Sequence, residues 1–414
     1  MLARRLAGPA LTVLLALPVV LAGPAPAAPR PEVSPRAADP HWVATWYGAP
    51  QDSTASATHQ SYRMIVHGAL GGRTVRLRLS NRYGTGPLRL SNVSIARPVG
   101  QSPQLQAGTL TRVTFGGSRD AVIPAGGELR SDPVAFRLPG DADVAVSFDL
   151  PGSAASVTQH PTTYSTSWVT LPGDGGHATE SSGAAFVMAR MPWSFLTGLE
   201  VDAAPDASTV VALGDSITDS VFQVPNGNTR WPDLVNDRIA ASDRWQRLRS
   251  LVNAGISGNM VTADRNDRAL KGEAAVTRMA WDVLDQPSVS HVVVFEGIND
   301  VGAGVDAATV IAGLRDLVAQ AHRRGLGVIV ATLTPTYGSL AYGRRYHDKQ
   351  AVRSAVNRWI RTSGVPDDVL DFSAAVSSGT SPESWLAALT ADFLHPNPGG
   401  LEVMARAFPL RYLG

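Results

Sequence analysis

From Trp42 to about Val201 apolar and polar residues alternate along the chain, a period of two that is typical of strands with one buried face. The pattern is clear in VAFRL (134–138) and recurs over residues 144–150. Gly and Pro clusters, such as the one at 71–72, separate these runs. Short alternating strands with frequent turn signals predict an antiparallel, β-sandwich-like domain, which we place at residues 41–201. No segment in this part predicts a helix.

A different pattern begins after the segment DAAPD (202–206). Short apolar runs, which predict buried strands, now alternate with longer stretches of helical periodicity. The predicted strands cover 209–213, 250–253, 291–295, 328–331 and 369–371. The predicted helices lie near 231–241, 306–324, 347–361 and 398–408. Such alternation predicts an α/β domain over residues 207–414, with a parallel sheet covered by helices on both faces.

Polar segments follow the ends of several predicted strands. GDSITDS (214–220) follows the first, NAGISGN (253–259) the second and EGINDVG (296–302) the third. DFLHP (392–396) comes after the last predicted strand. Because ligands of open α/β sheets bind outside the carboxyl ends of the strands, we expect these four segments to converge on one edge of the sheet.

The residues of these segments suit acyl transfer. A serine hydroxyl becomes a strong nucleophile when a neighbouring base takes its proton, and His395 is the best-placed base for Ser216. Asp392, three residues before His395, can orient the imidazole from the same loop. A developing oxyanion needs donors, for which Gly258 offers a backbone amide, Asn299 a carboxamide and Ser216 its own amide. Taken singly, each segment is also compatible with an ordinary turn or cap.

Together and in this order, the four segments resemble the signature blocks of the SGNH hydrolases, the GDSL-type esterase and lipase superfamily. The resemblance extends over residues 207–414 and implies a flavodoxin-like α/β/α domain, acyl-enzyme chemistry on a serine, and no metal or other cofactor. It places Ser216, Gly258, Asn299 and His395 at the four name-giving positions, with Asp392 as the triad acid. Asp215 adjoins the nucleophile in sequence, so we expect it to support the turn instead of serving as that acid.

The N-terminal half, beginning HWVATWYGAP (41–50), is similar to the β-rich domain that precedes the hydrolase domain in some secreted, actinobacterial-type members. Extracellular relatives often carry disulfides, whereas this chain has no cysteine. Its aromatic residues could form a sugar-stacking platform, but we expect them to fill the core of the sandwich. They are Trp42, Trp46, Tyr47, Tyr62 and Trp168.

The first residues predict export. Two arginines precede an apolar run from Ala10 to Ala22 that is too short to span a membrane, and small residues follow. This arrangement is typical of a secretory signal peptide, residues 1–27, ahead of a flexible Pro/Ala-rich leader, residues 28–40. The chain has 414 residues, a net charge of +1, and 44 % hydrophobic and 17 % charged residues, which is ordinary for a globular protein. Nothing in the charge distribution indicates a nucleic-acid surface or a polybasic membrane patch.

The segment TPTYGSLAYGRRYH (334–347) follows the fourth strand of the α/β domain. Its tyrosines, Tyr337 and Tyr342 among them, could line a substrate cleft or belong to a solvated loop. We therefore expect a secreted, monomeric serine esterase that acts on short-chain acyl groups, with saccharides as one candidate carrier of these groups. An extracellular lipase or phospholipase of the same chemistry, and a carbohydrate-binding protein with a vestigial hydrolase domain, are the alternatives.

Overall fold

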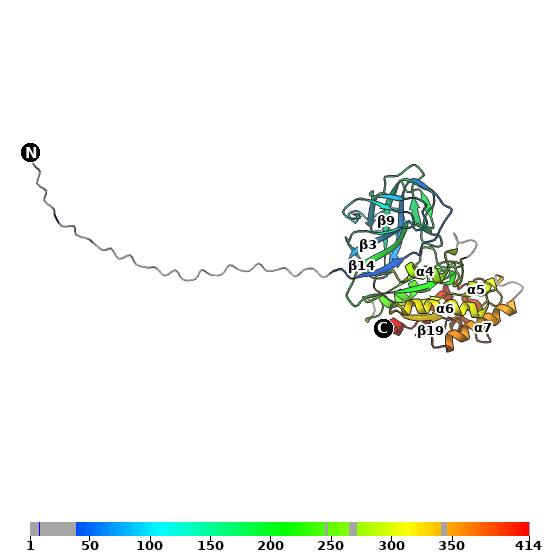
Figure 1. The fold of residues 1–414 in the computed structure, drawn as a ribbon. Helices are drawn as coiled ribbons and strands as arrows, with labels where there is room; N and C mark the ends of the chain where they lie inside the picture. The colour runs from blue at the N-terminus through cyan, green and yellow to red at the C-terminus, as the bar shows by residue number, and fades with distance from the viewer. Residues whose placement is uncertain (1–7, 9–38, 245–246, 265–270, 341–345, 414) are drawn as a thin grey trace, which may run out of the picture. The chain divides into compact units, whose positions relative to one another are not determined.

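The computed structural model describes residue 8 and residues 39–244, 247–264, 271–340 and 346–413, excluding the side chains of residues 346 and 347. The signal peptide and leader predicted from the sequence therefore lie outside the described residues, apart from Gly8, Asp39 and Pro40. Residues 40–414 pack as one unit (Figure 1). In the described part of the chain no helix is long and apolar enough to cross a membrane.

The first half folds into antiparallel sheets, as the alternating pattern predicts. One sheet has the order β1-β14-β3-β7, with β8 paired to β3. Its strands are β1 (Trp42–Tyr47), β3 (Gly72–Ser80), β7 (Glu128–Arg130), β8 (Val134–Leu138) and β14 (Leu196–Asp202). The other has the order β12-β11-β2-β9-β4-β5, with β6 paired to β4. Its strands are β2 (Ala57–Gly68), β4 (Leu88–Ala96), β5 (Thr111–Arg112), β6 (Asp120–Ile123), β9 (Ala142–Ala154), β11 (Ser167–Val169) and β12 (Met188–Arg190).

The inward-facing residues of these two sheets share one hydrophobic core. Val75, Leu77 and Leu79 of β3 meet Val146 and Phe148 of β9 there. Two short strands, β10 (Gln159–His160) and β13 (Trp193–Ser194), form a separate antiparallel pair. The expectation that aromatic residues fill the core of the sandwich is confirmed for two of the five, Trp46 and Tyr62, each 7 % exposed. Tyr47 is also buried, but in the core of the α/β part.

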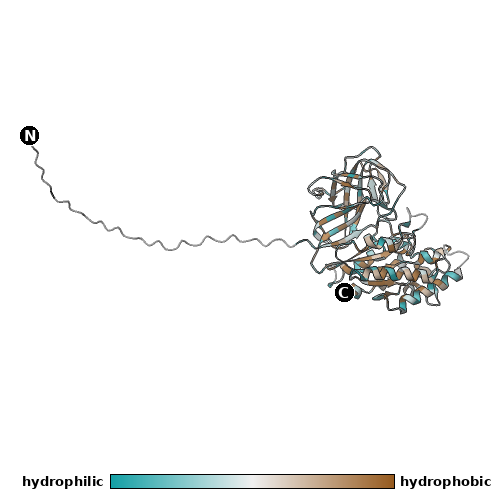
Figure 2. Ribbon diagram, viewed as in Figure 1, coloured by the Kyte–Doolittle hydropathy of each residue, from teal (hydrophilic) through white to brown (hydrophobic). Residues whose placement is uncertain are grey.

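The second half contains a parallel sheet of order β16-β15-β17-β18-β19, so all five predicted strands are confirmed. They run over β15 (Ser208–Gly214), β16 (Arg249–Gly255), β17 (Val289–Phe295), β18 (Gly327–Ala331) and β19 (Asp368–Leu370). Most of their residues are buried, because helices cover both faces of the sheet. Figure 2 shows these strands predominantly in the hydrophobic colour.

The four long predicted helices are present as α2 (Trp231–Ala240), α6 (Ala307–His322), α7 (Tyr346–Thr362) and α9 (Pro398–Ala407). Shorter elements were not predicted. They are the helices α1 (Ser216–Asp219), α4 (Ala275–Asp282), α5 (Ile298–Ala303) and α8 (Phe372–Val376), the hairpin β20 (Ser377–Ser378) and β21 (Ser381–Trp385), and the 3₁₀ turns η2 (Ala387–Leu389) and η3 (Leu410–Leu413). Helix α2 packs beside α9, and α6 packs beside α4 and α7, which gives the α/β/α layering.

Strand β1 belongs to both halves of the molecule. Val43 and Trp46 point into the core of the antiparallel sheets, whereas Ala44 and Tyr47 point into the core of the α/β part. The Ala44 amide also donates to Oγ1 of Thr209 in β15, at 2.9 Å. The two halves are therefore joined by a shared strand as well as by the connection at residues 203–207.

His67 of β2 lies at this junction between carboxylates. Its ring nitrogens pair with Asp143 and Asp141, both at 2.8 Å, and Asp233 of α2 adds negative charge nearby. Burial alone would lower the pKa of His67, but its hydrogen bonds and the charges of these carboxylates raise it to about 9. The folded protein therefore binds a proton that the unfolded chain releases near pH 6.5.

This proton gives a prediction for stability. The contribution of His67 is fully present below pH 6.5 and is lost as the pH rises through 9. Because Asp141 is exposed and screened by solvent, we expect the wild type to lose about 2 kcal/mol more than His67→Gln between pH 6 and pH 9.5. Urea unfolding at the two pH values measures the difference. Equal losses in the two proteins would show that His67 is not the group responsible.

Candidate active site

Ser216 lies at the turn between β15 and α1. Asp215 is the N-cap of this helix and its Oδ1 accepts the Ile217 amide at 2.9 Å, so it supports the turn as expected. As the first residue of the helix, Ser216 has no intrahelical acceptor for its own amide. The Ser216 hydroxyl lies 2.9 Å from Nε2 of His395, on a segment 179 residues away in sequence.

His395 is held by the loop between η2 and α9. Its Nδ1 lies 2.8 Å from Oδ2 of Asp392, and its amide donates to Oδ1 of the same carboxylate at 2.7 Å. Thr390 fixes the loop further, because its hydroxyl donates to the His395 carbonyl at 2.8 Å. Burial would raise the pKa of Asp392, but the hydrogen bonds from the His395 ring and amide lower it to about 2. Asp392 is therefore ionised at neutral pH and favours the tautomer of His395 with its proton on Nδ1.

Gly258 and Asn299 lie on two neighbouring loops of the same sheet edge. Gly258 has φ +78°, and a Cβ there would lie 2.4 Å from Cδ of Lys271, so glycine suits this position for two reasons. Asn299, in α5, donates from Nδ2 to the Asn259 carbonyl at 3.0 Å. This amide nitrogen carries two hydrogens, so the bond fixes the Asn299 side chain and leaves its second N–H for another acceptor.

The segment that carries Gly258 is tied to the helix that carries Ser216. Asp219, at the end of α1, accepts from the amide of Ser257 at 2.9 Å and from its hydroxyl at 2.6 Å. All four polar segments predicted to converge are thus connected by hydrogen bonds. Ser216, His395 and Asp392 form a continuous chain of hydrogen-bonded side chains.

Two aromatic residues beside His395 carried no signal in the sequence. The Phe222 ring packs edge-on against the His395 ring, with centroids 5.8 Å apart, and its side chain is 43 % exposed. Phe393 lies in the loop of His395 with φ +62°, and its ring lies so near Gly338 that a Cβ there would be 3.2 Å from its Cγ. In the sequence, the only hint of a role for these two residues is that they lie near Ser216 and His395 in the chain. Nearness in the chain does not distinguish them from their neighbours.

Tyr337 is 54 % exposed, and its amide donates to the Glu383 carbonyl of β21 at 3.0 Å. It adjoins Gly338, so its loop packs beside the loop of His395. This position is compatible with a role at the rim of the site. Tyr342, the second predicted rim residue, lies outside the described residues.

Arg278 of α4 lies buried beneath the site, and its five N–H groups all have acceptors. They reach Oδ2 of Asp282 (2.7 Å), Oε1 of Glu296 (3.1 Å), Oδ1 of Asn259 (2.9 Å), and the carbonyls of Ala254 (2.7 Å) and Gly214 (2.9 Å). Three of these acceptors lie at the ends of neighbouring strands. Gly214 is the last residue of β15, Ala254 is the last but one of β16, and Glu296 directly follows β17. Arg278 therefore fixes the edge of the sheet on which the site is built.

The buried carboxyl groups around Arg278 titrate abnormally. Burial raises the pKa of Asp282, and burial together with the charge of Asp215 raises that of Glu296 well above its usual range. The positive charge of Arg278 opposes both shifts. The guanidinium of Arg278 is therefore the main group that lowers the free-energy cost of burying negative charge beneath the site.

Comparison with known proteins gives one family. Residues 212–403 match the GDSL-like lipase/acylhydrolase family. A comparison with curated proteins finds no match.

Solved structures of esterases and lipases match about half of this chain. An acetylxylan esterase from Geobacillus stearothermophilus is 24 % identical with a TM-score of 0.37, over 51 % of this chain and 95 % of its own. A carbohydrate acetylesterase from Sinorhizobium meliloti is 16 % identical with a TM-score of 0.38, over 48 % and 95 %. A GDSL-like lipase from Bacteroides thetaiotaomicron is 16 % identical with a TM-score of 0.36, over 50 % and 87 %.

Proposed function

Because this chain carries a GDSL-like lipase/acylhydrolase domain over residues 212–403 and is an ester hydrolase of the SGNH type, we propose that it is a secreted serine esterase with Ser216 as its nucleophile. One observation carries the assignment of residues: the hydrogen-bonded chain from Ser216 Oγ to His395 (2.9 Å) and from His395 to Asp392 (2.8 Å). This is the arrangement in which a base removes the proton of a serine and an acid orients the base.

In the proposed reaction, Ser216 Oγ attacks the ester carbonyl as its proton passes to Nε2 of His395. The carbonyl oxygen gains the negative charge, and the amides of Ser216 and Gly258 with Nδ2 of Asn299 donate to it. His395 then gives its proton to the departing alcohol, leaving the acyl group on Ser216. Water, deprotonated by the same histidine, attacks this acyl-enzyme and releases the acid.

We place the substrate among short-chain acyl esters, with extracellular saccharides as a candidate carrier of the acyl group, because the sequence predicts export and carries no long apolar lid. Exposed Phe222 and Phe393 beside His395 favour a second candidate, a lipase whose substrate has a longer apolar acyl chain. Both candidates use the same chemistry and differ in the length of the acyl group that the site accepts.

Hydrolysis of p-nitrophenyl acetate, butyrate, octanoate and palmitate separates the candidates. For the mature chain we expect the highest kcat/KM on acetate or butyrate, roughly tenfold or more above palmitate, because a site that fits a short chain leaves a long one exposed to water. A preference for palmitate would establish the lipase instead. Release of acetate from an acetylated polysaccharide would then test the saccharide part of the proposal.

A fluorophosphonate probe provides a control that does not depend on the choice of ester. It should label Ser216, identified by mass spectrometry, and hydrolysis should disappear in proportion to labelling. A wild-type protein with neither turnover nor labelling would contradict the esterase proposal. Attention would then move to the β-rich half as a carbohydrate-binding module.

A further inference from the structure

The antiparallel half of the molecule contacts the nucleophile turn directly. His160, in the short strand β10, places Nε2 3.0 Å from Oδ1 of Asp219, the last residue of the helix that begins with Ser216. We propose that His160 is a positioning residue for ester hydrolysis, which acts through Asp219 on both the nucleophile turn and the segment of Gly258. This inference rests on the proposed function of Ser216.

The hydrogen bonds of His160 fix the orientation of its ring. Its Nδ1 lies 2.9 Å from the Ala49 carbonyl, which can only accept, and its Nε2 faces the carboxylate of Asp219. Each ring nitrogen is therefore held by a partner on a different segment of the chain. The two side chains are only 5 % and 1 % exposed, so little solvent weakens their attraction. Trp193 stacks on the ring, with centroids 5.6 Å apart, and limits its movement.

Asp219 shares its carboxylate between the two halves of the molecule. Oδ1 faces His160, while Oδ2 accepts both the amide and the hydroxyl of Ser257. Ser257 directly precedes Gly258, whose amide is a proposed oxyanion donor. Close backbone approach supports the same link, because a Cβ on Gly255 would lie 2.4 Å from the Asp219 amide nitrogen. A displacement of Asp219 would therefore move the nucleophile and an oxyanion donor relative to each other.

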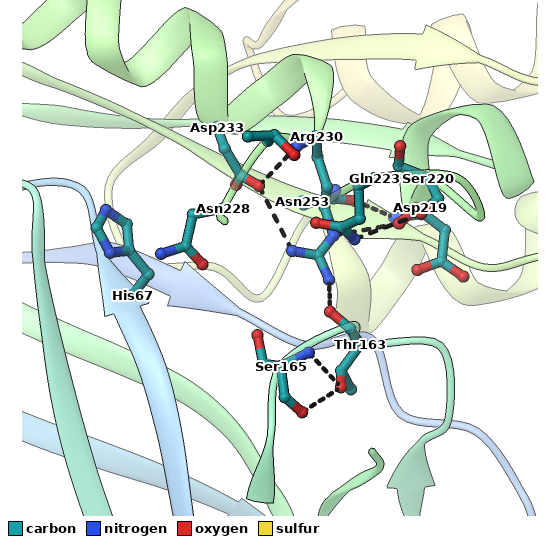
Figure 3. Close-up of polar contacts among 12 residues, drawn as sticks. His67, Thr163, Ser165, Asp219, Ser220, Gln223, Asn228, Arg230, Asp233 and Asn253 are labelled. Carbon is teal, nitrogen blue, oxygen red and sulfur yellow. Dashed lines mark hydrogen bonds and ion pairs between the residues drawn. The ribbon is translucent and has the colours of Figure 1, made fainter. Parts of the chain in front are cut away.

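Two further contacts join the antiparallel half to groups around the site. Arg230 donates to the Asp219 carbonyl at 3.1 Å and also to the Thr163 carbonyl, and thus bridges the two parts (Figure 3). Beneath the site, the Tyr47 hydroxyl donates to Oδ1 of Asp282 at 2.6 Å, and Asp282 holds Arg278. The antiparallel half thus contacts both the turn of Ser216 and the carboxylate that holds Arg278.

A matched pair of variants tests the role of His160. Gln places an amide near the position of Nε2 and can still donate to Asp219, whereas Asn places it near Nδ1 and can donate only to Ala49. Each variant removes the ring and one hydrogen bond, so a purely structural role predicts similar activities. We expect His160→Asn to lower kcat per titrated Ser216 by about 10- to 100-fold with little change in KM, because small misplacements of reacting groups are costly. His160→Gln should stay within about threefold of the wild type.

The measurements are kcat and KM on the best p-nitrophenyl ester, and the rate of fluorophosphonate labelling of Ser216. His67→Gln is the control, since it removes another histidine at the junction, one that does not touch the nucleophile turn. Should His160→Asn fail to fold, Asp219→Asn is expected to give the same loss of kcat, because it removes the charge that both His160 and Ser257 contact.

The outcomes separate this inference from the function on which it rests. Slow labelling and low kcat in His160→Asn, with near-normal values in His160→Gln and His67→Gln, would support it. Equal activities of the Asn and Gln variants in a protein whose wild type is active would overturn the inference alone. A wild type that is neither active nor labelled would overturn the proposed function and this inference with it.

Discussion

Ser216→Ala is expected to lower kcat/KM by at least about 10⁴-fold on whichever p-nitrophenyl ester the wild type cleaves best. The change removes the oxygen that would form the acyl-enzyme and leaves His395 and the oxyanion donors in place. Any residual hydrolysis would come from water attacking a substrate bound by those groups, so it should not show an acyl-enzyme burst. Steady-state and pre-steady-state kinetics of the two proteins give the comparison.

The same substitution should have little effect on stability, because the Ser216 hydroxyl has one described side-chain partner, His395, at a partly exposed site. A change in unfolding free energy of about 1 kcal/mol or less is expected. Ser250→Ala in β16 is a matched control: Ser250 is fully buried and its hydroxyl has no hydrogen-bond partner among the described residues. It should keep full activity. Near-wild-type turnover in purified Ser216→Ala would refute the assignment of the nucleophile.

The parallel sheet could be predicted well because its signal is local. Val210, Val211, Val292 and Val293 belong to short, nearly continuous apolar runs, which is what a strand buried on both faces requires. Helices α6 and α7 are long enough for the helical period to be unmistakable. Helices α1, α5 and α8 have four to six residues, too few to show a period, and their formation depends on caps such as Asp215 and Asp371.

Helix α4 was missed for a different reason. It contains Arg278 and Asp282, both fully buried, at positions where a sequence pattern would place exposed residues. Their burial is possible because they pair with each other, with carbonyls of β15 and β16, with Glu296 directly after β17, and with Tyr47 of β1. Such pairing joins residues far apart in the chain, so the hydrophobic pattern contains no trace of it.

The residues of the candidate site likewise fall into those with a local signal in the sequence and those that depend on distant contacts. Ser216, Gly258, Asn299, Asp392 and His395 each stand in a short polar segment after a strand or in a terminal loop, so their type and order could be read from the sequence. His160 and Phe222 could not be identified from the sequence, because their place at the site depends on a contact with a distant segment. His160 contacts Asp219, and Phe222 contacts His395. The contribution of the antiparallel half to the α/β half therefore emerges only from the three-dimensional contacts.

Arg278→Met is expected to destabilise the protein by about 3–5 kcal/mol, measured as the unfolding free energy in urea. Methionine fills much of the volume but provides none of the five N–H donors. Asp282 and Glu296 would then lie buried without their cation, and the carbonyls of Gly214 and Ala254 would lose a donor. Because these carbonyls belong to the edge that carries Ser216, the folded fraction should also hydrolyse esters more slowly.

The control for this prediction is Arg406→Met in α9. Arg406 is also a helical arginine paired with an acid four residues away, Glu402, but its side chain is 70 % exposed. Solvent screens that pair, so its loss should change the unfolding free energy by no more than about 0.5 kcal/mol. The same substitution is made at both arginines, which differ in burial. The difference between the two losses of unfolding free energy therefore measures the cost of leaving buried charge without its partner. A loss below about 1 kcal/mol in Arg278→Met would mean that Asp282 and Glu296 take up protons at little cost and that the sheet edge does not depend on the guanidinium.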